Sequence, residues 1–151
     1  MTFEPIEVQV EDSVLIAAPI EAVFKFISDP DTRVDAITPL EARRQAEGEL
    51  GPGSPSQCEL KIAGRVLRYE TRSAVFEPPM RFVVEMQGDV TGEQSFTLAE
   101  EAGDTRLNLV LKYMVPPSWP SFYRKEPTRT RFAETLVSQT LANIKAALEM
   151  E

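Results

Sequence analysis

Histidine is missing from this chain of 151 residues, and cysteine occurs only once, as Cys58. The lack of histidine removes the most common general base and the most common metal ligand. One cysteine can form neither an internal disulfide nor a thiolate zinc site, and without a histidine to activate it we interpret Cys58 as a buried, unreactive thiol. We therefore predict no catalytic residue, no metal site and no cofactor.

Positive charge is also scarce, since 16 Lys and Arg face 24 Asp and Glu and the net charge is −8. Such a chain repels phosphate backbones, so we expect no nucleic-acid partner. No segment approaches the ~20 apolar residues that cross a bilayer. The acidic start, Met1–Pro5, lacks the basic and apolar regions of a signal peptide. We expect a soluble, cytoplasmic protein with a single domain over residues 1–151.

The first part of the chain predicts one strand and two short helices. Ile6–Ala17 begins with alternating apolar and polar residues, which is typical of a half-buried strand. Pro19 suits the first position of a helix, and four apolar residues follow at helical spacing: Ile20, Val23, Phe24 and Ile27. Asp29-Pro30 repeats the helix-start signal and predicts a second short helix that ends near Ile37.

The middle of the chain is typical of β-structure, and its end is typical of a helix. Short connections between the strands favour an antiparallel meander, and Glu101-Ala102-Gly103-Asp104 is typical of a tight hairpin turn between two of them. The six predicted strands are Leu40–Leu50, Ser56–Ile62, Val66–Phe76, Arg81–Gln87, Gln94–Leu98 and Arg106–Val115. Val115–Pro127 holds four prolines, so we predict that it is irregular. Thr128–Met150 contains neither proline nor glycine and predicts one long helix with an apolar face.

Four motifs in this order resemble those of the START/birch-pollen-allergen (SRPBCC) superfamily and its polyketide cyclase/dehydrase-like group. They are Ser13–Pro30, Gly51–Ser54, Phe76–Phe82 and Gly103–Leu107. The resemblance implies an α+β helix-grip fold, in which a curved seven-stranded antiparallel sheet wraps around a long C-terminal helix and two short helices follow the first strand. It also implies a cavity between sheet and helix. All four motifs are turns and caps, so they specify a scaffold and no chemistry.

Alternation along the strands places apolar residues and isolated polar groups on one face of the predicted sheet. Such a wall is typical of a small-molecule pocket, whereas a filled core with satisfied polar groups is the alternative. In Val66–Phe76 this face includes Val75, although a β-bulge would invert the assignment beyond it. The candidate ligand-binding residues are Arg44, Leu60, Tyr69, Thr71, Phe82, Val84, Gln94, Phe96, Leu109 and Tyr113 from the strands and Phe132, Leu136 and Thr140 from the helix.

Arg44 is the only charged residue among these candidates. A buried guanidinium must be paired or must bind an anion, because an isolated buried charge is strongly unfavourable. Arg44 therefore either meets a carboxylate or phosphate of a ligand, or exchanges faces with Arg43 so that both are solvated.

The proline-rich segment before the long helix combines three aromatic residues, Trp119, Phe122 and Tyr123, with Arg124 and Lys125. The superfamily resemblance implies that this segment lies near a cavity mouth. Three interpretations remain open: transient contact with an anionic membrane, a lid over the ligand, or a loop whose aromatics pin it to the body.

These observations favour the binding, or transport, of a small hydrophobic or amphipathic molecule. One alternative is an enzyme of the cyclase/dehydratase type, in which Arg44 and a tyrosine hydroxyl stabilise enolate oxygens. A second alternative is a module that docks on a membrane or a partner protein through residues 116–125.

Overall fold

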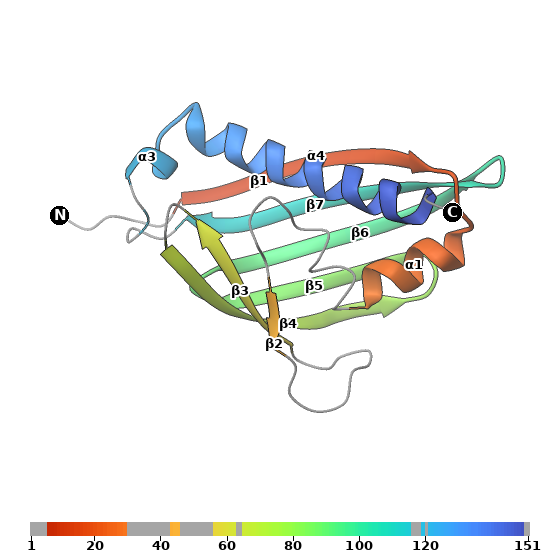
Figure 1. Ribbon diagram of the computed structural model, residues 1–151, viewed down its shortest axis with the longest axis horizontal. Coiled ribbons are helices and arrows are strands. Elements are labelled where there is room, and N and C mark those ends of the chain that lie inside the picture. Colours follow the sequence, from red (N-terminus) through yellow and green to blue (C-terminus); the bar gives the residue numbers. More distant parts are fainter. Residues whose placement is uncertain are drawn as a thin grey trace.

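The computed structural model describes residues 6–29, 43–45, 56–62, 65–115, 119 and 121–149. The order of elements within these residues is β1 (Ile6–Ile16), α1 (Ile20–Ser28), β2 (Arg43–Gln45), β3 (Ser56–Ile62), β4 (Arg65–Glu77), β5 (Arg81–Gly88), β6 (Thr91–Glu101), β7 (Asp104–Val115), α3 (Ser121–Arg124) and α4 (Thr128–Glu149). The described strands form a seven-stranded antiparallel sheet in the order β1-β7-β6-β5-β4-β3-β2. Helix α4 runs along one face of this sheet (Figure 1). The predicted helix-grip fold is confirmed.

The first and last strands along the chain are neighbours in the sheet, because β1 pairs with β7 along its whole length. Register places Val8 opposite Tyr113 and Ile16 opposite Thr105. All four side chains are buried. The hydrophobic core lies between this face of the sheet and α4 (Figure 1).

The helices differ from the sequence-based predictions at their ends. The four predicted apolar residues of α1 are all buried, but Pro19 is its N-cap, with an extended backbone, instead of its first helical residue. The predicted second short helix falls within residues 30–42, outside the described part of the chain. The prediction that Val115–Pro127 is irregular is wrong at Ser121–Arg124, which form one helical turn. This turn lies between the prolines of the segment, where no proline interrupts four consecutive residues.

The β6–β7 hairpin was predicted, and its turn shows why both strands are longer than expected. Glu101 pairs with Asp104, so the loop consists only of Ala102 and Gly103. Both residues have positive φ, 52° and 89°, as a two-residue hairpin turn of the I′ kind requires. The tight turn lets pairing continue to its edge, beyond the predicted start of the second strand at Arg106.

A β-bulge in β4 overturns the assignment of Val75 to the inner face. The register shifts between Ser73 and Val75, so that Val75 pairs with Val83 and Phe76 pairs with Phe82. Residues paired across a sheet share a face, and Phe82 belongs to the buried core. Beyond the bulge the inner residue of β4 is therefore Phe76. A bulge adds one residue to one strand, which inverts the alternation beyond it.

The α1 end of the interior is closely packed with aromatic rings. Phe24 of α1 makes edge-to-face contacts with Phe76 and Phe82, with ring centroids 5.3 and 6.2 Å apart. Phe82 in turn lies beside Phe96 of β6. Such rings fill space efficiently, so the described residues at this end of the molecule form a closely packed core. Among the described helices, none is both long and apolar enough to cross a membrane.

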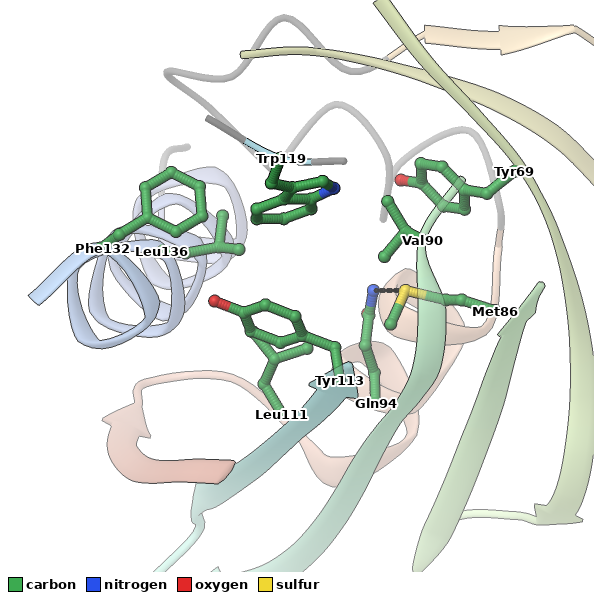
Figure 2. A pocket seen from close by; sticks show the side chains of 9 residues that line it. All are labelled: Tyr69, Met86, Val90, Gln94, Leu111, Tyr113, Trp119, Phe132 and Leu136. Carbon is green, nitrogen blue, oxygen red and sulfur yellow. Dashed lines mark hydrogen bonds between the residues drawn. The ribbon is translucent and has the colours of Figure 1, made fainter. Parts of the chain in front are cut away.

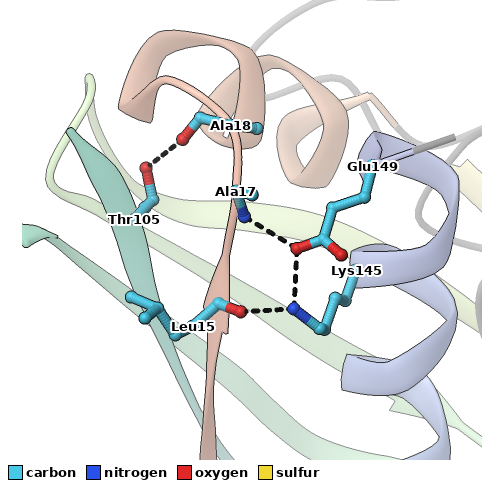
Figure 3. Close-up of polar contacts among 6 residues, drawn as sticks. All are labelled: Leu15, Ala17, Ala18, Thr105, Lys145 and Glu149. Carbon is cyan, nitrogen blue, oxygen red and sulfur yellow. Dashed lines mark hydrogen bonds and ion pairs between the residues drawn. The ribbon is translucent and has the colours of Figure 1, made fainter. Parts of the chain in front are cut away.

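Three hydrogen bonds of Lys145 and Glu149, which we call the clasp, fix the C-terminal end of α4 to the end of β1, and a fourth bond joins the adjoining Ala18 to β7 (Figure 3). Lys145 Nζ donates to the Leu15 carbonyl at 2.8 Å and to Glu149 Oε2 at 2.6 Å. The backbone N–H of Ala17 donates to the same Glu149 oxygen at 2.7 Å. Thr105 Oγ1 donates to the Ala18 carbonyl at 2.8 Å. The Ala17 N–H and then Lys145 lower the pKa of the Glu149 carboxyl, because both favour its ionised form.

Candidate functional site

A cavity lies at the other end of the interior, beneath the N-terminal half of α4 (Figure 2). The space open to the centre of a water molecule within it is about 40 Å³. Its walls are mainly apolar and aromatic, and its lining residues are Tyr69, Met86, Val90, Gln94, Leu111, Tyr113, Trp119, Phe132 and Leu136. They come from β4, β5, β6, β7, α4 and the turns and segments between them, so the site depends on the whole fold.

Strand pairing brings the polar residues of the cavity together. Gln94 of β6 pairs with Leu111, and Gly92 pairs with Tyr113. A Cβ atom on Gly92 would lie 2.1 Å from the carbonyl oxygen of Lys112. Only glycine permits this close approach of β6 to β7, and the approach occurs beside Tyr113, in the cavity wall.

Val90 reaches the cavity because the tip of the β5–β6 hairpin is tied back to β4. The Asp89 N–H donates to the Arg68 carbonyl at 2.9 Å, and the Arg68 N–H donates to Asp89 Oδ2 at 2.9 Å. Val90, the next residue, is buried. Sequence reasoning missed it because it lies in a turn. The sequence does carry a signal for its burial. Val90 is a β-branched apolar residue between Asp89 and Thr91, and a solvated turn favours polar residues at such a position.

Two polar side chains of the cavity differ in their hydrogen bonding. Gln94 Nε2 donates to the Met86 sulfur at 3.6 Å, a weak acceptor. The indole of Trp119 is 6% exposed, and its Nε1 has no hydrogen-bond partner within the described part of the chain. In Figure 2 this nitrogen lies on the edge of the indole that faces Tyr69 and Val90 across the cavity.

Tyr113 forms the floor below Trp119, with ring centroids 6.1 Å apart and planes inclined at 31°. Burial raises the pKa of Tyr113 to about 12, and the opposing effect of the nearby Arg129 charge is smaller. The phenol therefore stays protonated at neutral pH. In this form its hydroxyl can donate a hydrogen bond.

A second, smaller cavity of about 20 Å³ lies beside the first. Its lining residues are Gln94, Leu109, Leu111, Leu136, Val137 and Thr140. Gln94, Leu111 and Leu136 line both cavities, so these three side chains form the partition between them.

The structure distributes the predicted site residues over three environments. Lining the larger cavity are Tyr69, Gln94, Tyr113, Trp119, Phe132 and Leu136. Leu109 and Thr140 line the smaller one. Buried, but lining neither cavity, are Thr71, Phe82, Val84 and Phe96.

Four further candidates have side chains outside the described part of the structure: Arg44, Leu60, Phe122 and Tyr123. Backbone pairing places Arg44 opposite Cys58, and Cys58 opposite Tyr69. Besides Val90, the cavity residues missing from the candidate list are Met86, Leu111 and Val137. The alternation of their strands already placed Met86 and Leu111 on the inner face.

The basic residues beside the cavity are partly engaged within the chain. Arg129 donates to the Arg124 carbonyl at 2.9 Å and lies 3.7 Å from a Glu126 oxygen. Glu126 also accepts hydrogen bonds from the hydroxyl and the backbone N–H of Thr130. These bonds from Thr130, and to a smaller extent Arg129, lower the pKa of Glu126. The charges thus help to start α4 and hold it against α3.

Comparison with protein families agrees with this architecture. Residues 7–149 match the family described as "Polyketide cyclase / dehydrase and lipid transport". The chain belongs to this family. The family places the chain in the START/birch-pollen-allergen superfamily, as the sequence motifs predicted. No match was found among curated proteins.

Several solved structures share this fold. Protein CV1439 from Chromobacterium violaceum is 19% identical with a TM-score of 0.69, over 95% of this chain and 99% of that one. Ara h 8.0201 is 11% identical with a TM-score of 0.68, over 96% and 99%. The polyketide-cyclase-like protein Cgl2372 from Corynebacterium glutamicum is 21% identical with a TM-score of 0.60, over 97% and 94%. At these identities the likeness establishes the fold.

Proposed function

We propose that this polyketide cyclase/dehydrase-like protein binds a small hydrophobic or amphipathic molecule in the cavity between the sheet and α4. The observation that carries the proposal is a cavity under the N-terminal half of α4, with an apolar wall and a few polar groups. This composition is typical of sites that bind by apolar burial and use polar groups for orientation. The family description, which includes lipid transport, supports the same class of ligand.

The size of the cavity limits how the ligand is bound. About 40 Å³ holds a few water molecules, whereas a cavity of about 150 Å³ is needed for benzene. A ligand the size of benzene or larger therefore enters only when side chains of the wall move. Phe132 and Leu136 on α4 are only half-buried, so moving them loses fewer packing contacts than moving the buried Tyr113 or Trp119 would. We propose that the side chains of these two residues move when the ligand binds.

Removal of the partition should enlarge the site. In Leu136→Ala the two cavities merge, and we expect tighter binding of ethylbenzene than in the wild type, measured by NMR titration of ¹⁵N-labelled protein. The destabilisation should be about 2 kcal/mol, at the low end for a leucine-to-alanine change because Leu136 is half-buried. The matched control is Leu98→Ala, which truncates a buried leucine that lines neither cavity.

A ligand that remains bound during purification offers a direct test. Native mass spectrometry, followed by solvent extraction, should release a reproducible small molecule on denaturation and reveal its chemical class. If the purified protein is free of ligand and ethylbenzene perturbs no cavity residue in either the wild type or Leu136→Ala, the proposed function is wrong.

The two alternative functions stay predictions. The cyclase/dehydratase hypothesis requires the Arg44 guanidinium beside a tyrosine hydroxyl, and the docking hypothesis requires Trp119, Phe122 and Tyr123 at the surface. Trp119 is buried, and the side chains of Arg44, Phe122 and Tyr123 lie outside the described part of the structure. Binding in the cavity is the function that the described residues support.

A further inference from the structure

The indole N–H of Trp119 is a hydrogen-bond donor placed in a wall that is otherwise largely apolar. Trp119 is 6% exposed, and within the described residues nothing accepts a hydrogen bond from its Nε1. A buried donor without an acceptor is unfavourable, and native structures rarely retain one without a reason. The donor is therefore a feature to be explained by what enters the cavity.

The other polar groups of the cavity do not fill this role. Gln94 directs its amide nitrogen at the Met86 sulfur, which lies below the indole. The Tyr113 hydroxyl lies on the side of α4, near Leu136, and not beside the indole nitrogen (Figure 2). The indole nitrogen instead faces the hydroxyl of Tyr69 across the cavity (Figure 2). Both residues line the cavity, so an acceptor atom that enters it on the Tyr69 side can meet the indole N–H.

We propose that Trp119 Nε1, at the Tyr69 side of the cavity, binds an acceptor oxygen of the ligand, which is a carbonyl or a carboxylate oxygen attached to an apolar body. This inference rests on the proposed function and specifies its ligand class. An indole nitrogen only donates, so a ligand whose polar group only donates, such as an ammonium, leaves the indole unpaired. An apolar ligand also leaves it unpaired. The apolar body of the ligand lies against Leu111, Phe132 and Leu136.

Three probes of nearly equal shape separate these cases: ethylbenzene, acetophenone and benzoate. Acetophenone replaces one CH₂ group of ethylbenzene by a carbonyl, and benzoate replaces the methyl group of acetophenone by a charged oxygen. Dissociation constants are measured for the wild type, Leu136→Ala and Trp119→Phe. The ratio of the ethylbenzene constant to the acetophenone constant is then compared between proteins, so that the different hydration of the probes cancels.

The expected result is a ratio that is about tenfold smaller in Trp119→Phe than in the wild type, as the loss of one hydrogen bond implies. The matched control is Phe132→Leu, which also reduces aromatic volume in the wall but removes no donor. It should change the affinities for ethylbenzene and acetophenone by similar factors. Comparison of acetophenone with benzoate shows whether the natural group is a neutral carbonyl or a carboxylate.

A second measurement does not depend on the folding of any variant. The chain has a single tryptophan, so its indole N–H gives one side-chain signal of its kind in a ¹⁵N spectrum. Acetophenone or benzoate should move the proton of this signal downfield, as formation of a hydrogen bond does, and ethylbenzene should not.

The outcomes separate the inference from the proposed function. Binding of all three probes with an unchanged ratio in Trp119→Phe and no downfield shift overturns the inference and leaves the proposed function intact. Absence of binding of every probe, in both the wild type and Leu136→Ala, overturns the proposed function and the inference with it.

Discussion

Tyr113 illustrates how one residue combines packing and polarity. Its ring lies between β7 and Trp119, and its hydroxyl is carried into the cavity by the register of β7. Burial keeps the phenol protonated far above neutral pH. The residue therefore gives the cavity wall a donor that does not titrate under physiological conditions.

The raised pKa of Tyr113 predicts a loss of stability at high pH. The folded pKa of about 12 exceeds the ordinary value of 10.0, so the folded state retains its proton where the unfolded state loses it. The stabilisation is complete below the unfolded pKa and is lost as pH rises through the folded one. Two pKa units correspond to roughly 3 kcal/mol. Urea unfolding from neutral pH to about pH 12 should show this loss in the wild type and not in Tyr113→Phe.

The comparison with Tyr113→Phe isolates one residue, because every other titrating group is the same in both proteins. Parallel stability curves for the two proteins across this range would show that Tyr113 ionises as freely in the folded state as in the unfolded one.

At the level of single residues, sequence patterns predicted inner faces well and lining residues less well. Alternation placed Tyr69, Gln94 and Tyr113 on the inner face, and all three line the larger cavity. The same alternation placed Phe82 and Phe96 there, yet they lie in solid core. Alternation reports which face a residue occupies. Whether that face meets a ring or empty space depends on contacts with distant elements such as α1.

At the level of elements, the clasp predicts that the attachment of α4 weakens in acid. The lowered pKa of Glu149 means that its stabilising effect is present above the unfolded value, near 4.5, and is lost as pH falls through the folded pKa. Glu149→Gln should therefore be less stable than the wild type at neutral pH, and this difference should shrink in acid. Thermal unfolding at a series of pH values measures it.

Lys145→Met provides the control for the clasp. It removes the hydrogen bond to Leu15 and the ion pair but leaves the Ala17 N–H to bond with Glu149. Because the Ala17 N–H is the larger cause of the lowered pKa, part of the pH dependence should remain. A variant as independent of pH as Glu149→Gln would contradict the assigned order of causes.

Alanine substitutions at Gly92 and Gly103 should lower the free energy of unfolding by different amounts, because only Gly92 lies where β6 closely approaches β7. Gly92→Ala places a methyl group 2.1 Å from the Lys112 carbonyl oxygen, so the strands must separate beside Tyr113. We expect a destabilisation of about 3 kcal/mol or more and weaker binding of acetophenone. Gly103→Ala meets no atom but has a φ of +89°, so it should cost only about 1–2 kcal/mol and leave binding unchanged. Urea unfolding and probe titration test both; equal effects on binding would contradict this account.

At the level of elements the sequence was most informative where local chemistry decides the structure. Periodicity predicted the burial of all four apolar residues of α1, and Glu101–Asp104 predicted the hairpin. The bulge after Ser73 was invisible in the pattern, because Val75 and Phe76 are both apolar and either can face inwards. The short helix α3 was missed because the prolines around it dominate the local signal.

At the level of the whole molecule, the described interior packs aromatic rings together near α1 and has the two cavities under the N-terminal half of α4. Segments with fewer buried apolar contacts open more readily and exchange their amide protons faster. We therefore predict faster exchange for the helical amides near Phe132 and Leu136 than for those near Leu141 and Ile144. Native-state hydrogen exchange read by NMR measures this difference, and acetophenone should reduce it. Uniform protection along α4 would contradict it.

The clasp has a mechanical consequence for α4, a helix of 22 residues that it fixes at the C-terminal end and that borders the cavity near its N-terminal end. The distance from Glu149 back to Phe132 is about 25 Å at 1.5 Å per residue. If the helix tilts about the clasp by about 5°, Phe132 is displaced by roughly 2 Å over that length. Side chains beside the clasp hardly move in the same tilt. The clasp therefore acts as the pivot, and the volume of the cavity can change while the packing around α1 stays as it is.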